Sequence, residues 1–220
     1  GASKIFDTPK PSRLIKRASE ISTSKSAEHI ILDFFSGSCA SAHAVLNLNK
    51  EDGGNRKFIM VQLPEPCEEK SEAFKAGYKT IADIGKERIR RVIHNIEKEQ
   101  DGQLDLDSGG RPQDLGFKVF KLSESNFKTW QGDEEDPAKL QEQLEMHVNH
   151  VNPSSTPEDI LYELLLKAGF PLTTKVEKIS ISDKSAYSIA EGALIICLDD
   201  DLTKEAIQAI AALKPVQCIC

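Results

Sequence analysis

The sequence predicts an α/β fold, in which a partial Rossmann-like sheet is followed by a small α+β appendage. Two short apolar segments, residues 29–35 and 58–63, are typical of strands buried in a parallel sheet. Between them lie a glycine turn and an Ala-rich helical segment, so the order is that of a βαβ unit. After residue 152 the pattern changes to helices and short strands, which indicates a separate α+β unit.

The first part of the chain contains the elements of the expected sheet. Pro9 and Pro11 disfavour a helix at the start, and Ser12 is placed to cap the helix that follows. Residues 52–55, Asp-Gly-Gly-Asn, are expected to end the helix of the βαβ unit. The elements expected in order are an extended segment at 4–11, a helix at 13–21, a strand at 29–35, a helix at 39–48, a strand at 58–63, a helix at 81–99 and a third strand at 117–122.

The last part of the chain is expected to form its own domain. Thr156, Pro157 and the acids after them are a good helix start, and Gly169 ends that helix. Strands are expected at 175–182, 187–189, 193–198 and 216–220, with a helix at 203–213. The chain is therefore divided into residues 1–122, a linker or variable segment at 123–152 that holds a weak helix candidate at 131–150, and a small domain at 153–220.

Composition narrows the class of protein. The net charge of −7 argues against a self-sufficient nucleic-acid binder, because phosphate contacts need clustered Lys and Arg. Five cysteines without a CxxC pair argue against a disulfide framework or a zinc site and fit a reducing, cytoplasmic compartment. No apolar stretch is long enough to span a bilayer, so no membrane partner is expected. His147 and His150 fit a solvated helix end better than a metal site.

A candidate binding site follows the first strand. Residues 33–38 end this strand and enter a helix, and ligands of open α/β sheets lie beyond the carboxyl ends of the strands. Gly37 allows a close backbone approach, and the helix start offers unpaired N–H groups. Glu65, after the next strand, could accept hydrogen bonds from ribose hydroxyls, as in sites that bind adenosine. A nicotinamide-dependent dehydrogenase is disfavoured, because the turn lacks the later glycines of GxGxxG.

Longer segments resemble one family. They are Phe6-Asp7-Thr8-Pro9-Lys10-Pro11, Asp33-Phe34-Phe35-Ser36-Gly37-Ser38 with Ala42-His43-Ala44-Val45-Leu46 after it, residues 48–59 and residues 77–91. These segments resemble the modification subunits of type III restriction–modification systems, which are DNA adenine methyltransferases with the beta-class amino-methyltransferase order. The chain is similar to their carboxy-terminal half. The similarity is specific over residues 4–122 and looser over residues 198–215.

The resemblance implies S-adenosylmethionine as the cofactor. The cofactor-binding residues that it implies are Phe6, Thr8, Lys10, Asp33, Phe35, Gly37 and Glu65. Lys10 would lie near the cofactor carboxylate, and Glu65 would hold the ribose. The chain departs from the family at Cys39-Ala40-Ser41, where glycine and two threonines are usual, so a side chain is added where the backbone approaches the cofactor. Catalysis by the Cys39 thiol is disfavoured, because no histidine or acid partner is evident nearby in the sequence.

The resemblance also implies missing parts. Family members hold a flipped adenine with an acid, two adjacent prolines and an aromatic residue, and this chain has ten prolines without a Pro-Pro pair. We therefore expect a fragment without a catalytic residue, a metal or a target-recognition region, inactive alone, in a protein that contacts DNA mainly through other regions. An open strand edge predicts a homodimer or another covering partner, such as the restriction subunit. The alternative is a non-catalytic assembly module, in which residues 123–220 dock a modification or restriction subunit.

Overall fold

The computed structural model describes residues 5–101, 114–128, 141, 150–199 and 201–220. Contacts within the chain divide it into two compact units, Gly1–Phe117 (unit 1) and Lys118–Cys220 (unit 2). Most of the weak helix candidate at 131–150 lies outside the described residues, as does His147.

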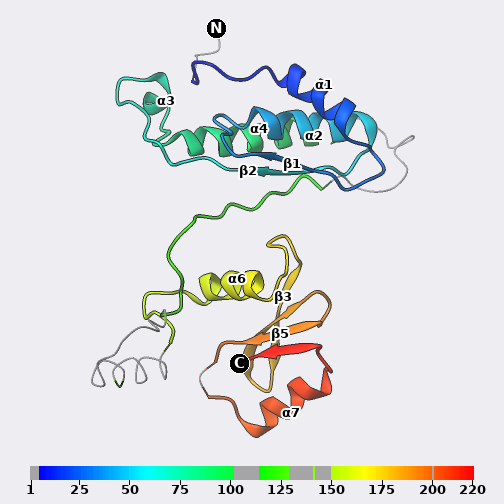
Figure 1. The fold of residues 1–220 in the computed structure, drawn as a ribbon, viewed down its shortest axis with the longest axis vertical. Helices are drawn as coiled ribbons and strands as arrows, with labels where there is room; N and C mark the ends of the chain where they lie inside the picture. The colour runs from blue at the N-terminus through cyan, green and yellow to red at the C-terminus, as the bar shows by residue number, and fades with distance from the viewer. Residues whose placement is uncertain (1–4, 102–113, 129–140, 142–149, 200) are drawn as a thin grey trace. The chain divides into compact units, whose positions relative to one another are not determined.

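Unit 1 contains the βαβ unit that the sequence predicts. Strands β1 (Ile30–Asp33) and β2 (Lys57–Met60) pair in parallel, with Ile30 opposite Lys57, and α2 (Ala40–Asp52) connects them. The other helices of unit 1 are α1 (Ser12–Ser22), α3 (Glu72–Lys75) and α4 (Ile81–Asp101). Helices α1, α2 and α4 lie side by side on one side of the sheet (Figure 1). The turn from β1 into α2 therefore lies at the carboxyl edge of the sheet, where ligands of this architecture bind.

The ends of two helices show how local sequence sets their length. Helix α2 runs four residues beyond the predicted 39–48 and ends at the predicted stop, because Gly53 adopts a left-handed φ of 69° and its N–H donates to the Asn49 carbonyl at 2.9 Å. The prediction that Ser12 caps α1 is wrong. Ser12 is the first helical residue, Pro11 takes the cap position, and no side chain caps this helix. The Pro11 carbonyl accepts hydrogen bonds from the Leu14 and Ile15 N–H groups at 3.1 and 3.3 Å, and α1 therefore begins one residue before the predicted 13–21.

The core of unit 1 lies between α2, α4 and one face of the sheet. Its buried members are Cys39, Ala42, Leu46, Ile89, Val92 and Ile96, with Phe58, Met60 and Phe117 packed against them. The opposite face of the sheet is apolar and exposed. Its exposed side chains are Ile30, Leu32, Ile59, Val61 and Leu63. Side chains of a strand alternate between the two faces, so among the described residues helices cover one face of each strand and leave the other exposed.

The prediction of a third strand at 117–122 is wrong. These residues are described, and none of them is in a strand. Phe117 is half-buried against the α2–α4 core, with the Arg90 guanidinium 5.9 Å from its ring centre. Leu122, at the other end of the segment, is fully exposed. The apolar residues of this segment match a strand pattern, but a strand also needs a neighbour to pair with, and Phe117 packs against a helix instead.

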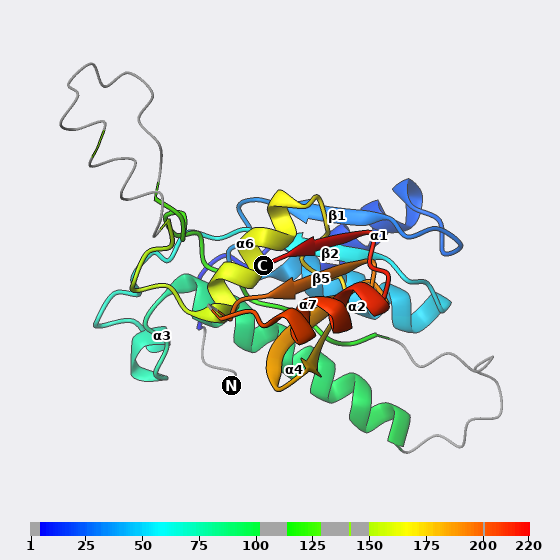
Figure 2. The ribbon, with the colours of Figure 1, turned by 90° about the horizontal axis from the view of Figure 1, so that it is seen from below.

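Unit 2 is a four-stranded mixed sheet with a helix on each face. Strands β3 (Val176–Ile181), β4 (Lys184–Ile189), β5 (Leu194–Cys197) and β6 (Gln217–Ile219) lie in that order. The first three are antiparallel, and β6 runs parallel to β5 after the connecting helix α7 (Lys204–Ala212). Helix α6 (Pro157–Lys167) lies on the opposite side of the sheet from α7 (Figures 1 and 2). The helices and strands predicted in this region are confirmed, although β4 begins three residues before the predicted 187–189.

Both faces of the unit 2 sheet are buried. Leu161 and Leu165 of α6 pack with Leu194 and Ile196 on one face, and Ile210 of α7 packs with alternate strand residues on the other. All four residues of β5 are buried as a result. Helix α6 starts where the sequence predicts, because Thr156 and Asp159 form a reciprocal capping box.

Candidate functional site

The turn that follows β1 is tied to the segment that follows β2. The Val61 N–H donates to the Asp33 carbonyl at 2.9 Å, and the Ser36 N–H donates to the Val61 carbonyl at 3.2 Å. The Gly37 N–H donates to the Gln62 Oε1 at 2.7 Å. Gly37 has a φ of 53°, in the left-handed region that favours glycine. These bonds fix the shape of the turn at the carboxyl edge of the sheet.

Asp33 is the centre of the polar contacts at this edge. Its carboxylate accepts hydrogen bonds from Lys10 Nζ at 3.2 and 3.3 Å and from Ser41 Oγ at 2.5 Å. The Phe35 N–H also donates to it, at 3.3 Å. Partial burial raises the pKa of Asp33, but the hydrogen bonds from Ser41 and Lys10 and the charge of Lys10 outweigh it and hold the pKa below its ordinary value. Asp33 is therefore a carboxylate at neutral pH.

The segment before α1 crosses the same turn. Besides Asp33, Lys10 Nζ contacts the Phe35 carbonyl at 3.4 Å. The Phe6 ring lies against Gly37 so closely that a Cβ on Gly37 would be 3.2 Å from its Cζ. Five of the seven residues implied by the resemblance thus meet at one place, because Phe6 and Lys10 reach the turn that contains Asp33, Phe35 and Gly37.

The other two implied residues are less closely placed. Thr8 is an exposed residue of the same segment before α1. Glu65 lies in the loop after β2, where its backbone carbonyl accepts a hydrogen bond from the Ile81 N–H at 2.9 Å and its side chain is exposed. Gln62, which sequence reasoning missed, is the residue of this loop whose side chain contacts the turn. Nothing in the local sequence distinguishes Gln62, because its contact depends on how β1 and β2 pair.

Cys39 occupies the cap position of α2 with a left-handed φ of 56°, where glycine would be free of strain. Its side chain is buried in the α2–α4 core, and its Sγ lies 3.6 Å from Ser36 Oγ. Burial raises the pKa of the Cys39 thiol, which keeps it protonated at neutral pH. The added side chain therefore points into the core, and a nucleophilic role is disfavoured further.

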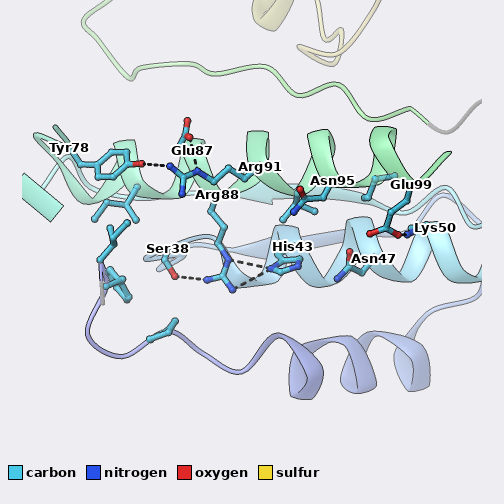
Figure 3. A pocket seen from close by; sticks show the side chains of 16 residues that line it. Ser38, His43, Asn47, Lys50, Tyr78, Glu87, Arg88, Arg91, Asn95 and Glu99 are labelled. Atoms are coloured by element: carbon cyan, nitrogen blue, oxygen red, sulfur yellow. Dashed lines mark hydrogen bonds and ion pairs between the residues drawn. The ribbon is translucent and has the colours of Figure 1, made fainter. Parts of the chain in front are cut away.

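A groove of about 670 Å³ lies beside this turn, between the segment before α1, helix α2 and helix α4 (Figure 3). Arg88 of α4 reaches across it. Its Nη1 donates to Ser38 Oγ at 2.8 Å, and its Nε and Nη2 lie 3.4 and 3.3 Å from His43 Nδ1. Burial, with the charge of Arg88 second, lowers the pKa of His43, so the imidazole is neutral at pH 7. The acids interleaved with the basic residues of this helix favour a solvated face for Arg88, but its side chain is half-buried instead.

Other groups of the described residues give no sign of a metal or membrane site. No cluster of three or more His, Cys, Asp or Glu side chains could hold a metal ion within the described ranges. None of the helices in that part of the chain combines the length and the apolar character that crossing a bilayer requires. The polar edge around Asp33 is therefore the strongest candidate site on the described residues.

Known proteins similar to this chain come from restriction–modification systems. The StyLTI Mod subunit of Salmonella typhimurium, from a type III restriction-modification enzyme, is 38% identical over 125 residues, which is 57% of this chain. The Mod subunit of the type III enzyme EcoPI of Escherichia phage P1 is 31% identical over 215 residues, or 94% of this chain. The type II methyltransferase M.KpnI of Klebsiella pneumoniae is 41% identical over 94 residues, or 43% of this chain. No protein-family model matches the chain.

These similarities define the class: the chain is related to the methyltransferases of restriction–modification systems. Within that class it is similar to a segment of the Mod subunits of type III systems, as the resemblance of its motifs predicts. The chain spans only 18% and 29% of the length of the StyLTI and EcoPI Mod subunits, so it corresponds to a segment of them.

Proposed function

We propose that unit 1 binds S-adenosylmethionine, as the cofactor-holding part of a site-specific DNA adenine methyltransferase. The observation that carries this proposal is the ion pair of Lys10 with Asp33 at the carboxyl edge of the sheet, 3.2 Å between Nζ and Oδ2. The amino-acid end of S-adenosylmethionine has one ammonium and one carboxylate. Asp33 matches the ammonium and Lys10 matches the carboxylate, so the ligand can replace each residue's present partner.

The surroundings of this pair suit the rest of the cofactor. Lys10 is more than half exposed, which leaves the pair open to a ligand. Phe34 and Phe35 are largely exposed aromatic rings beside Asp33, and their centres are 5.1 Å apart. An apolar ring offers a surface for adenine to pack on. We assign Asp33, Phe35 and Gly37 to the floor of the site and Glu65 to the ribose hydroxyls. Phe6, Thr8 and Lys10 would lie against the cofactor.

The bound cofactor would supply an electrophilic methyl group, and the proposed acceptor is the exocyclic amine of adenine in DNA. The residues of this chain hold and orient the cofactor, while the pocket for the flipped base lies in other parts of the protein. DNA is accordingly contacted mainly elsewhere, which fits the net charge of −7. In this proposal residues 1–122 belong to a Rossmann-like methyltransferase sheet, and residues 153–220 form an interaction domain for a second Mod copy or a restriction subunit, all in the bacterial cytoplasm.

Titration calorimetry of the chain with S-adenosylmethionine and with NAD tests the proposal. We expect binding of S-adenosylmethionine alone. Asp33→Asn and Lys10→Met should each weaken this binding by about tenfold or more, because each removes a charge-assisted contact. Lys57→Met is the matched control, since Lys57 forms an exposed ion pair with Glu28 away from the turn. Binding of NAD, or an affinity for S-adenosylmethionine that Asp33→Asn does not change, would contradict the proposal. Failure to bind either ligand would favour the non-catalytic assembly module.

A further inference from the structure

Helix α4 approaches the turn after β1 through a glycine. Gly85 lies so close that a Cβ built on it would be 2.6 Å from Cys39 Sγ and 3.2 Å from the Gly37 carbonyl oxygen. At 2.6 Å a Cβ would displace the Cys39 side chain, and 3.2 Å is a tight contact. The absence of a side chain at residue 85 therefore lets the backbone of α4 lie this close to the turn.

Arg88 reaches the same turn from the next helical position on that face, since residues three apart are neighbours on a helix. Its Nη1 donates to the hydroxyl of Ser38, which is itself buried, across 50 residues of sequence. The same guanidinium faces His43 Nδ1, and a neutral imidazole can accept there when its proton is on Nε2. Figure 3 shows the arginine extending from α4 to Ser38 and His43.

The contacts of Arg88 differ from those of its neighbours along the groove. Lys50 pairs with Glu99, and Arg91 pairs with Glu87 at 2.8 Å. Arg88 is half-buried, yet its hydrogen bonds among the described residues go to a hydroxyl and an imidazole. A partly buried guanidinium loses hydration, and it regains hydrogen bonds here from Ser38 of the turn and from His43 of α2.

The turn needs such external support. Gly37 and Cys39 both have left-handed φ angles, 53° and 56°, and this conformation is strained for a non-glycine residue such as Cys39. Strained backbone persists only where the surrounding structure holds it.

We propose that Gly85 and Arg88 of α4 are positioning residues, which clamp residues 37–39 in the shape that binds the cofactor. Gly85 sets the close approach of the helix, and Arg88 fixes Ser38. This inference rests on the proposed binding of S-adenosylmethionine at the turn. The two residues contact the turn, so in this inference they act on binding through the shape of the turn.

The test compares Arg88→Met with Arg91→Met in the full chain. Arg91 is on the same helix and lines the same groove, but it contacts Glu87 and Tyr78 rather than the turn. Calorimetry with S-adenosylmethionine should show a loss of affinity of about tenfold for Arg88→Met and no change for Arg91→Met. Ser38→Ala should cause a similar loss, and the double variant Arg88→Met/Ser38→Ala should lose no more than either alone, because both remove one contact.

Hydrogen exchange without ligand gives a second readout that does not depend on the cofactor. The Cys39 N–H donates to the Ser36 carbonyl at 2.8 Å inside the turn. Its exchange should accelerate in Arg88→Met and stay unchanged in Arg91→Met. Additive losses of affinity for Arg88→Met and Ser38→Ala, or unchanged exchange at Cys39, would overturn the clamp. A wild-type chain that binds no S-adenosylmethionine but still shows the exchange difference would overturn the proposed function and leave the clamp standing.

Discussion

The two units each contain a four-residue apolar strand, but the two strands differ in how far they are buried. All four residues of β5 in unit 2 are buried, because α6 covers one face of its sheet and α7 the other. In unit 1, the residues of β1 alternate between exposed and half-buried, because helices cover one face only. Both strands are apolar in sequence, so composition alone does not show which sheet is covered twice. The comparison indicates that unit 2 is closed on itself, whereas unit 1 presents an apolar face.

The comparison is tested most strongly by truncating a leucine in each unit. Leu165 of α6 is 0% exposed and Leu32 of β1 is 57% exposed. Leu165→Ala should lower the free energy of unfolding of unit 2 by about 2–5 kcal/mol, because it leaves a cavity. Leu32→Ala should cost less than about 1 kcal/mol, because its side chain is largely in water already. Urea unfolding followed by circular dichroism, with hydrogen exchange at β1 and β5 to assign the loss, measures both values.

Leu166→Ala is the control for helix propensity, since Leu166 is the exposed neighbour of Leu165. A cost for Leu32→Ala as large as that for Leu165→Ala would mean that the apolar face of unit 1 is covered in solution. The expected homodimer, which stays a prediction, is one way in which that could happen.

A second prediction concerns Glu163, a partly buried acid that stabilises unit 2. Glu163 of α6 accepts hydrogen bonds from Ser125 Oγ at 2.5 Å and from the Asn126 N–H at 2.7 Å, and it pairs with Lys167. Partial burial acts to raise the pKa of Glu163, but these hydrogen bonds lower it to about 2 from the ordinary 4.5. Glu163→Gln should cost about 1.5–3 kcal/mol at neutral pH, because a charged acceptor is lost.

The sign of the pH dependence follows from the direction of this shift. A depressed pKa adds stability that is fully present above pH 4.5 and is lost as the pH falls toward about 2. Glu163→Gln should remove that part of the pH dependence when unfolding is measured between these values. Glu158→Gln, at an exposed site in the first turn of α6, is the control. Equal acid sensitivity of wild type and Glu163→Gln would refute the assignment.

A third prediction concerns the contact of Gly85 with Cys39 in unit 1. Gly85→Ala should destabilise unit 1 by about 1–3 kcal/mol, because the new methyl group overlaps Cys39 Sγ. Cys39→Gly alone should be nearly neutral, because relief of the left-handed strain offsets the loss of a buried side chain. The double variant should regain most of the stability that Gly85→Ala loses. Thermal unfolding measures this cycle, and purely additive effects would show that the two residues do not interact.

The smallest change in the free energy of unfolding is expected at the start of a helix, where α6 and α2 differ. Thr156 completes a capping box at α6, whereas Cys39 at the start of α2 makes no side-chain cap bond. Thr156→Ala should cost about 1 kcal/mol in the unfolding of unit 2. Ser154→Ala, at an exposed position just before the helix, should change little. If both variants unfold at the same urea concentration as wild type, the cap contributes nothing to unit 2.

Much of the fold follows from local sequence, as the ends of α2 and α6 show. Gly53 and Thr156 act through their own backbone and side chain, so the sequence is enough to place them. The absent third strand shows the limit, because pairing depends on a neighbour that no local pattern specifies.

The residues of the candidate site also fall into two groups, those that local sequence predicts and those that it does not. The motif around Asp33 and Gly37 is local and could be predicted. Gln62 and Arg88 could not, since each reaches the turn only after strands and helices have packed. Ser41 could have been anticipated from the resemblance, because family members usually have threonine at that position. Its hydroxyl donates a hydrogen bond to Asp33.

The ion pair of Lys10 with Asp33 has a consequence for how ionic strength should act on this protein. An amino-acid group that replaces this pair brings one positive and one negative charge, so the local charge is the same before and after the exchange. Added salt screens the Lys10–Asp33 pair and the two pairs that replace it to a similar extent, so their difference changes little. Retention of the amino-acid end should therefore change little with salt, while attachment to a polyanion such as DNA would fall steeply.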